Sequence, residues 1–219
     1  MESEIDRFVK AGIYRPVTYS KWAAPLVPVL KGPDKQSVRL CGDYKITANK
    51  AIMTEQYKMP TIEEIFSRLA GAKYFVKLDI SEAYAQLPLD AESQELVTVN
   101  TTKGLFAVTR LSYGVSSAPL IFQRTMDTLL GDIKGTSAYI DDLLVTGRME
   151  ADVCKRLHLV FKCLSNAGLC CRNEKRIFNF TSVTYLGYVI DANGLHLTNE
   201  KVKAITEAPA PVDETQLQS

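Results

Sequence analysis

The amino-acid sequence predicts an α+β fold in which helices cover one face of an antiparallel sheet. Apolar runs of strand length occur in neighbouring pairs joined by short turns, a pattern typical of antiparallel hairpins. Segments with one apolar helical face are interleaved with these pairs. The chain has 219 residues, enough for one large domain or two small ones with a real core.

The first segment is predicted to be a short helix followed by a hairpin. Ser3–Asp6 resembles a capping box, apolar residues follow at helical spacing, and Gly12 ends the helix. Tyr14–Pro25 is interpreted as an irregular segment because prolines interrupt it. Leu26–Leu30 and Val38–Cys41 are predicted strands joined by a Gly-Pro turn.

A stronger capping box, Thr61–Glu64, begins the next predicted helix, which ends at Gly71. The remaining elements follow in order. They are a strand at Lys73–Ile80, a hairpin of Leu96–Thr101 and Leu105–Arg110, a loop at Leu111–Pro119, a helix at Leu120–Leu130, a hairpin around Asp141–Asp142, a helix at Val153–Leu164 closed by Gly168, a hairpin of Tyr185–Ile190 and Leu195–Leu197, and a helix capped by Thr198 that stops before Pro209. Small residues in the Leu111–Pro119 loop would let a backbone or a planar ligand approach closely, although ordinary loop chemistry explains them equally well.

Three carboxylates stand at the ends of apolar runs. Asp141 and Asp142 lie between two short apolar arms, and Asp79 ends the strand before them. An Asp pair alone fits a hairpin turn, because Asp is common in turns. Beside apolar flanks, however, two ionised neighbours are costly unless a cation lies between them. If the Asp79 strand pairs with the hairpin, all three carboxylates meet at one edge of the sheet.

Hard oxygen ligands without nearby His or Cys favour Mg²⁺ or Mn²⁺ over zinc. Two such ions could clamp the attacking and leaving oxygens of a phosphoryl displacement. The sequence contains no P-loop and no GxGxxG pattern, so kinase-like and Rossmann chemistry lack support.

Charge and composition limit the class of protein. The net charge of +1 does not by itself indicate a nucleic-acid binder, but clustered carboxylates can hide a local basic groove. Basic residues do gather in and after the first hairpin, at Lys31, Lys35, Arg39, Lys45 and Lys50. They fit a solvated surface or a phosphate-facing lobe. No signal peptide, no membrane span and an odd number of cysteines predict an intracellular protein, cytoplasmic or nuclear, without membrane contact.

Several motifs, in register, resemble those of reverse transcriptases, most closely the Gypsy-type LTR retrotransposon polyproteins. Val76–Leu87 resembles their first metal-binding motif, Leu111–Pro119 with Phe122-Gln123 resembles their template-and-nucleotide motif, and Tyr139–Asp142 is similar to their YxDD hairpin. Gly12–Pro16 and Tyr185–Tyr188 also agree in order and spacing. The resemblance runs along nearly the whole chain.

The resemblance implies a role for individual residues. Asp79 and Asp141 would be the principal Mg²⁺ or Mn²⁺ ligands, with Asp142 the third catalytic carboxylate. Tyr84 would lie under the deoxyribose as a steric gate. Nucleotide-binding residues would be Lys31, Arg39, Tyr84, Tyr113, Gly114 and Lys175. Template and primer contacts would come from Gln123, Tyr185, Leu186 and Gly187.

The same resemblance implies a right-hand polymerase palm with fingers, in a reverse transcriptase domain over residues 1–195. Fingers would comprise about 1–55 and 88–117, and the palm about 56–87 and 118–195. Residues 196–219 would begin a truncated thumb or connection, so that the thumb is largely absent. The expected partners are dNTPs, an RNA or DNA template-primer, and the connection and RNase H regions of a polyprotein.

The predicted activity is RNA-directed DNA polymerisation, a nucleotidyl transfer. An inactive retroelement remnant that binds nucleic acid or a protein partner is the alternative from another class. A palm-fold nucleotidyl cyclase shares the two-metal chemistry but gives no reason for the Leu111–Pro119 motif.

Overall fold

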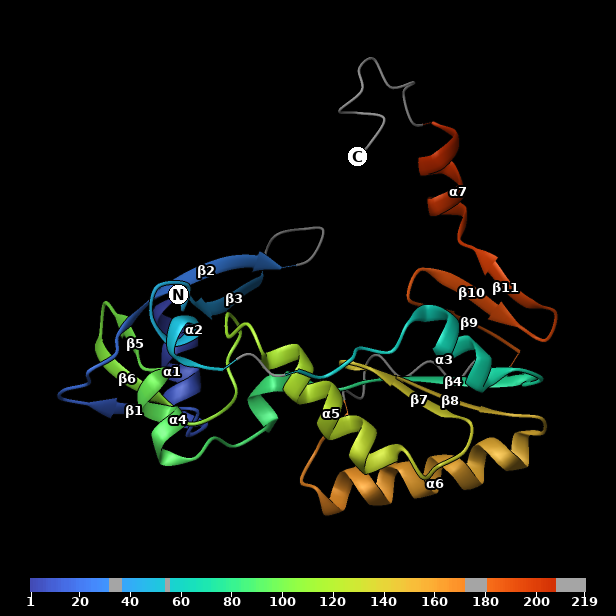
Figure 1. The fold of residues 1–219 in the computed structure, drawn as a ribbon, viewed down its shortest axis with the longest axis horizontal. Helices are drawn as coiled ribbons and strands as arrows, with labels where there is room; N and C mark the ends of the chain where they lie inside the picture. Colours follow the sequence, from blue (N-terminus) through green and yellow to red (C-terminus); the bar gives the residue numbers. More distant parts are fainter. Residues whose placement is uncertain (32–36, 54–55, 172–180, 208–219) are drawn as a thin grey trace.

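The computed structural model describes residues 1–31, 37–53, 56–171 and 181–207, with the side chains of Lys31 and Ser37 left out. These residues form two lobes side by side, with a hairpin and a final helix extending from the second lobe (Figure 1). No helix in these ranges is both long enough and apolar enough to cross a membrane.

The first lobe is built on a five-stranded sheet of order β1-β6-β5-β2-β3, and is hereafter the five-stranded lobe. Its strands are β1 (Tyr14–Val17), β2 (Ala24–Lys31), β3 (Ser37–Gly42), β5 (Val99–Thr101) and β6 (Gly104–Val108), and its helices are α1 (Glu2–Lys10), α2 (Ala48–Ala51) and α4 (Ala91–Leu96). Buried apolar side chains from α1 and the sheet, among them Ile5, Leu26 and Val99, form its core.

The second lobe, hereafter the central lobe, contains an antiparallel sheet of order β4-β8-β7. Its elements are α3 (Ile62–Leu69), β4 (Tyr74–Asp79), the 3-10 helix η1 (Ala83–Gln86), α5 (Ala118–Leu130), β7 (Thr136–Tyr139), β8 (Asp142–Gly147) and α6 (Glu150–Asn166). The reciprocal capping box predicted at Thr61 begins α3, and Pro119 occupies the first turn of α5.

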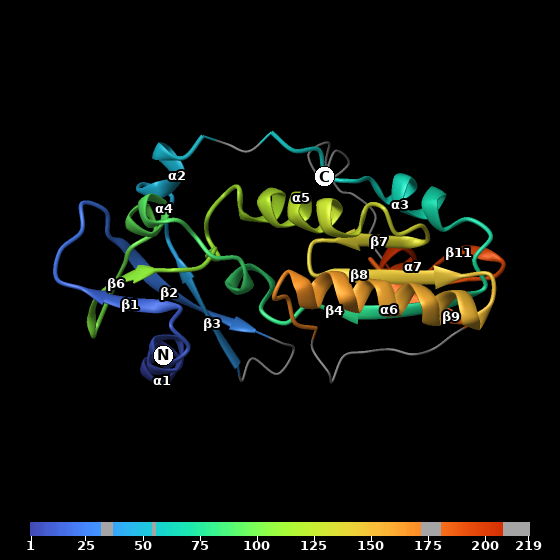
Figure 2. The ribbon, with the colours of Figure 1, turned by 90° about the horizontal axis from the view of Figure 1, so that it is seen from below.

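Alternating side chains divide the central sheet into two buried faces. Val76, Leu78 and Val145 pack against the long helices α5 and α6, which lie along the strands in Figure 2. Phe75 and Leu144 point to the opposite face. There they pack against α3 and against Val183, Tyr185 and Ile190 of the C-terminal strands described below. The α+β fold and the covering of one face by long helices are confirmed, and the second face carries the shorter elements. Asp79, an even number of residues from Phe75, lies on this second face.

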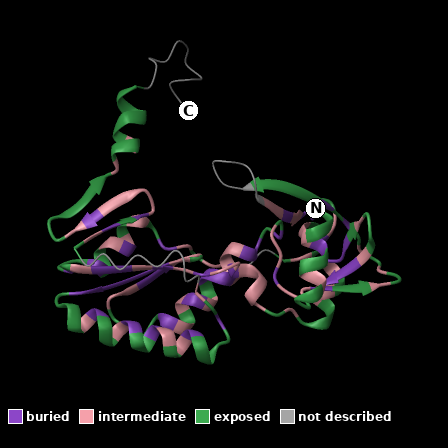
Figure 3. Ribbon diagram, turned by 180° about the vertical axis from the view of Figure 1, so that it is seen from behind, coloured by how far each residue is buried: buried purple, intermediate pink, exposed green. Residues whose placement is uncertain are grey.

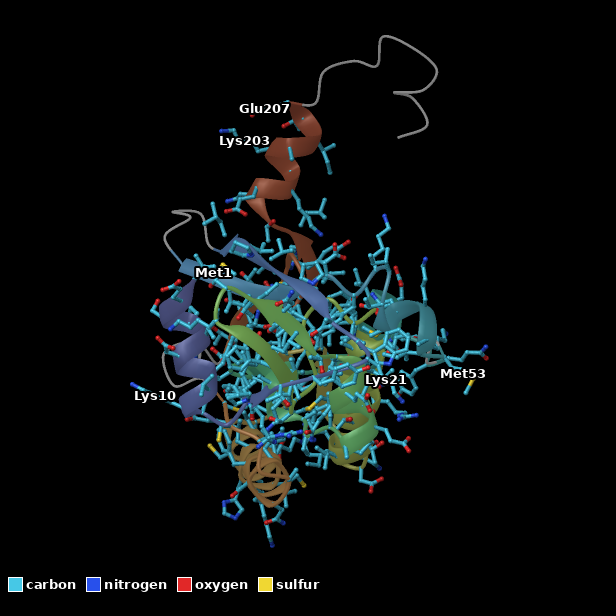
Figure 4. All side chains as sticks on the ribbon, turned by 90° about the vertical axis from the view of Figure 1, so that its left-hand side faces the viewer. Met1, Lys10, Lys21, Met53, Lys203 and Glu207 are labelled. Atoms are coloured by element: carbon cyan, nitrogen blue, oxygen red, sulfur yellow. The ribbon has the colours of Figure 1, made fainter. Side chains whose placement is uncertain are left out.

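An antiparallel meander and a helix complete the described chain. They are β9 (Ser182–Tyr185), β10 (Tyr188–Asp191), β11 (Gly194–Leu197) and α7 (Asn199–Thr206). Thr198 caps α7 as predicted. The helix buries no residue, is coloured as exposed in Figure 3, and presents Lys203 and Glu207 away from the lobes in Figure 4.

Four local predictions differ from the structure. Helix α1 begins at Glu2 with Met1 as N-cap, so Ser3 lies inside the helix and makes no cap. Tyr14–Val17 is a strand rather than an irregular segment, and its Pro16 is tolerated because β1 is the edge of the sheet. Leu96 ends the unpredicted helix α4, which Asp90 caps. Tyr185–Ile190 is two strands, because Leu186 and Gly187 form a turn with positive φ.

Candidate active site

Strand β4 and the β7–β8 hairpin bring Asp79 and Asp141 to one cavity. Asp79 lies opposite Asp142 in the β4–β8 register, and the N–H of Ile80 donates to the Asp141 carbonyl at 2.9 Å. Both Asp79 and Asp141 line a cavity of about 170 Å³, whose other walls come from the segment that follows Asp79 and from the five-stranded lobe. The prediction that the Asp79 strand pairs with the Asp141 hairpin is therefore confirmed.

Asp141 belongs to a two-residue turn of unusual conformation. Ile140 and Asp141 connect the Tyr139–Asp142 pair, and Ile140 has φ +53°. A β-branched residue is rarely found with positive φ, and such strain costs about 1–3 kcal/mol. The turn therefore depends on the surrounding contacts for its shape. One of these contacts is the 2.7 Å hydrogen bond from the Ile140 N–H to the side chain of Gln123.

Burial raises the pKa of the Asp141 carboxyl, and the neighbouring charges of Asp142 and Asp79 raise it further. A backbone N–H and the guanidinium of Arg39 act in the opposite direction. The ionised form of Asp141 is thus disfavoured by desolvation and repulsion, and a cation in the cavity would relieve both. Mg²⁺ commonly takes one or two protein carboxylates and completes its shell with water and phosphate, so the pair Asp79 and Asp141 fits such an ion.

Asp142 is engaged elsewhere. Its carboxylate accepts from Lys77 Nζ at 3.0 Å, and its carbonyl accepts from the hydroxyl of Tyr185 at 3.2 Å. Across the described ranges, no three His, Cys, Asp or Glu side chains gather closely enough to hold a metal ion. Asp142 is thus paired with Lys77 in this structure, while Asp79 and Asp141 line the cavity.

A stack of aromatic and cationic groups extends from the five-stranded lobe to the central core. The guanidinium of Arg39 lies 4.3 Å from the ring centroid of Tyr113. Tyr113 and Tyr84 have centroids 4.8 Å apart, and Tyr84 meets Phe122 edge-on at 5.8 Å. Burial raises the pKa of Tyr84 to about 12, so its hydroxyl stays protonated at neutral pH. Arg39 and Tyr113 line the cavity of the two carboxylates.

The loop at Leu111–Pro119 uses its small residues to pack against backbone. Gly114 has φ +101°, and a Cβ there would overlap the carbonyl oxygen of Gly42. Asn49 clamps the same loop, because its amide donates to the Gly114 carbonyl and accepts from the Ser116 N–H, each at 2.9 Å. Of the two explanations left open by the sequence, close approach of a backbone accounts for Gly114.

A family model described as reverse transcriptase (RNA-dependent DNA polymerase) matches residues 30–190, more than half of the chain. The chain belongs to the reverse transcriptase family.

Relatives of this reverse transcriptase domain include retrotransposon polyproteins. It is 36% identical to an uncharacterised Caenorhabditis elegans protein, K02A2.6, over all of this chain and 17% of that protein. It is 33% identical to the Pol polyprotein of the Drosophila melanogaster transposon gypsy, over 96% of this chain and 21% of that protein. The chain thus spans about a fifth of the length of these relatives.

Among solved structures, a foamy viral protease-reverse transcriptase in complex with double-stranded DNA is 28% identical, with a TM-score of 0.89 over 99% of this chain and 38% of that chain. The same viral protein in complex with an RNA/DNA hybrid gives a TM-score of 0.84, at 28% identity over 99% of this chain and 29% of that chain. The polymerase fold expected from the motifs is confirmed.

The other expected contact residues of this reverse transcriptase domain lie away from the cavity or outside the description. Gln123 and Tyr185, predicted to contact template and primer, are fully buried. Leu186 and Gly187 form the half-buried turn between β9 and β10. Lys31 lies in β2 without a described side chain, and Lys175 falls outside the described residues.

The sequence motifs of reverse transcriptases did not point to Lys77, Asn49 or Arg7. Lys77 precedes Asp79 by two residues, so strand alternation places both on one face and could have indicated its contact with Asp142. Asn49 carried no local signal. Arg7 of α1 pairs at 2.9 Å with Glu82, in the segment that follows Asp79, and only the tertiary structure joins these positions.

Proposed function

We propose that this reverse transcriptase domain extends a primer with dNTPs on an RNA or DNA template. The observation that carries this proposal is the common cavity of Asp79 and Asp141, faced by Arg39 and Tyr113. The foamy viral structures, which contain double-stranded DNA or an RNA/DNA hybrid, support nucleic acid as the partner. In the reaction, a primer oxygen forms a bond to the α-phosphorus of the dNTP while the bond to pyrophosphate breaks.

Asp79 and Asp141 would hold Mg²⁺ or Mn²⁺ through carboxylate oxygens. When bound, such ions stabilise the charge that develops on the attacking and leaving oxygens. The two carboxylates would hold the ions in place, Asp79 from the end of β4 and Asp141 from the β7–β8 turn. Asp142, paired with Lys77, would contribute negative charge near the ions and would stabilise the shape of the hairpin, rather than act as a direct ligand.

Arg39 would face the triphosphate, because guanidinium groups bind phosphate oxygens through several donors at once. Stacking on Tyr113 supports this role, since it leaves the N–H edges of the guanidinium available in the cavity. Lys31 and Lys175 are proposed for the same phosphates from the sequence resemblance alone. Tyr84, between Tyr113 and Phe122, would lie under the sugar and exclude a 2′-hydroxyl. Leu186 and Gly187 are proposed as the turn that contacts the primer.

Primer extension by the full chain tests this proposal. Asp79→Asn and Asp141→Asn should each lower kcat by about 1,000-fold or more, because several kcal/mol of charge stabilisation disappear. Asp142→Asn should lower kcat by a smaller factor, since the Asp142 carboxylate already pairs with Lys77. The matched control is Asp132→Asn, at an exposed position of the central lobe. Extension by Asp79→Asn or Asp141→Asn at the rate of the control would remove the assignment.

A further inference from the structure

Gln123 lies beneath the catalytic turn as a fully buried polar side chain. Its Nε2 donates to the carbonyl of Ala138 at 3.0 Å and to both carboxylate oxygens of Asp127 at 3.1 Å. Its Oε1 accepts from the N–H of Ile140 at 2.7 Å. The amide is therefore fully satisfied with 0% exposure, the arrangement expected of a buried group that specifies one conformation.

These contacts fall on the part of the hairpin whose backbone is strained. Ala138 precedes the turn, and Ile140, with φ +53°, is the residue directly before Asp141. Without Gln123 the Ile140 N–H would lose this hydrogen bond, and nothing in the local sequence favours a positive φ at an isoleucine. Gln123 thus holds the backbone from which the Asp141 side chain departs.

A second contact layer fixes the orientation of Gln123 itself. Asp127, one helical turn further along α5, accepts from Gln123 on one side and from the hydroxyl of Tyr57 at 2.6 Å on the other. Since a carboxylate can only accept, the NH₂ end of the Gln123 amide must face Asp127, and its oxygen must face Ile140. The connection runs from Tyr57, through Asp127 and Gln123, to the turn.

We propose that Gln123 is a positioning residue of the polymerase site, which places Asp141 through the backbone of Ile140 and touches neither template nor primer. The expected change in kcat rests on the proposed function, because it can be measured only if the chain extends a primer. Asp127 supports Gln123, and Tyr57 supports Asp127, so the effect of a substitution should decrease along this order.

Steady-state kinetics of the full chain test the proposal with Gln123→Met, which keeps the length of the side chain and removes its hydrogen bonds. We expect kcat to fall by ~100-fold, the scale of a misplaced reacting group, with KM for dNTP and Kd for a primer-template duplex unchanged within about twofold. Tyr57→Phe should lower kcat by less than about fivefold. Gln94→Met is the matched control, because Gln94 also bonds a backbone carbonyl, at 2.8 Å, but in the five-stranded lobe.

A charge-preserving exchange separates positioning from loss of packing. Gln123→Glu should repel Asp127 and lose activity. Gln123→Glu combined with Asp127→Asn restores the donor–acceptor pair between these two residues, although the bond to the Ala138 carbonyl stays lost, and should recover at least about tenfold of the lost kcat. Failure of the double variant to exceed Gln123→Glu would overturn the proposal. A rise in Kd for the duplex with unchanged kcat would also overturn it and favour a template contact.

Amide hydrogen exchange supplies a readout that needs no activity. In Gln123→Met the exchange of the Ile140 N–H should accelerate by ~100-fold, while Val145 in the core of β8 keeps its protection. Equal loss of protection at Ile140 and Val145 would indicate a general structural role and overturn the inference. If the wild-type chain extends no primer, the proposed function fails, and the exchange at Ile140 still decides whether Gln123 holds the turn.

Discussion

The two lobes hold their cavity-lining residues in different ways. In the central lobe, Asp141 depends on a buried hydrogen-bond network beneath the turn, in which Gln123 has no exposed surface. In the five-stranded lobe, Arg39 and Tyr113 are held by stacking at the half-buried wall of the cavity. A buried, fully bonded network permits one geometry, whereas a stack tolerates sliding.

This difference suggests a division of work between the lobes. The central lobe fixes groups that must be aligned with the reacting atoms, where small displacements are costly. Under the proposed function, the five-stranded lobe would present groups that bind the nucleotide and can adapt to it. Substitutions in the central lobe should therefore change kcat, and those in the five-stranded lobe should change KM or discrimination between substrates.

The largest effect that would sharpen this comparison is expected at Gly114, where the five-stranded lobe does use rigid packing. In Gly114→Ala the new methyl group meets the Gly42 carbonyl at a positive φ, so we expect the free energy of unfolding to fall by about 3 kcal/mol and KM for dNTP to rise. Gly104→Ala is the matched control, because Gly104 has φ +110° with nothing within 4 Å of a Cβ. Denaturant unfolding of both variants measures the contribution of close packing. Equal losses of unfolding free energy in the two variants would show that the positive φ, and not the contact with Gly42, determines the cost.

A smaller effect is expected at Tyr84, where the two lobes meet. Tyr84 packs against the cores of both lobes, and its ring lies between Tyr113 and Phe122. Tyr84→Val should raise the ratio of ribonucleotide to deoxyribonucleotide incorporation by about 10- to 100-fold, because it opens space beside the sugar. Tyr84→Phe keeps the ring and should leave that ratio unchanged. A ratio unaffected by Tyr84→Val would remove the steric-gate assignment and weaken the proposed division between the lobes.

The sequence allowed the parts of this site that depend on local pattern to be predicted. Asp79 at a strand end and Asp141 in a hairpin have clear local signals, and antiparallel pairing of neighbouring elements brings them together. The cap at Thr61 and the helix that begins near Pro119 were likewise encoded within a few residues.

What could not be predicted depends on tertiary placement. The motif resemblance predicted a template contact for Gln123, whereas its hydrogen bond to Ala138 follows from the packing of α5 beneath β7, which no periodicity specifies. The strand at Tyr14–Val17 contains Pro16 and is stable only because β6 supplies a partner at the sheet edge. Strand alternation indicates that Lys77 shares a face with Asp79, but the ion pair of Lys77 with Asp142 also depends on the β4–β8 register, which is a tertiary feature.

The smallest expected effect concerns the ion pair that joins the lobes. Arg7 of α1 contacts Glu82 at 2.9 Å, with 46% and 38% of the two side chains exposed, and it also contacts Glu4 at 2.9 Å within its own helix. Exposed pairs contribute about 0.2–1 kcal/mol and are screened by salt. A double-mutant cycle of Arg7→Gln and Glu82→Gln should therefore give a coupling energy of at most about 1 kcal/mol at low salt.

The matched cycle of Arg7→Gln and Glu4→Gln, within one helix, sets the scale for a pair that joins no lobes. If the relative position of the lobes is maintained by their shared apolar contacts, the two coupling energies should agree within about 0.5 kcal/mol. A coupling for Glu82 above about 2 kcal/mol would mean that this pair, rather than packing, fixes how the five-stranded lobe faces Asp79. The contrast between a rigid and an adaptable lobe would then fail, because the adaptable lobe would itself be anchored beside the reacting groups.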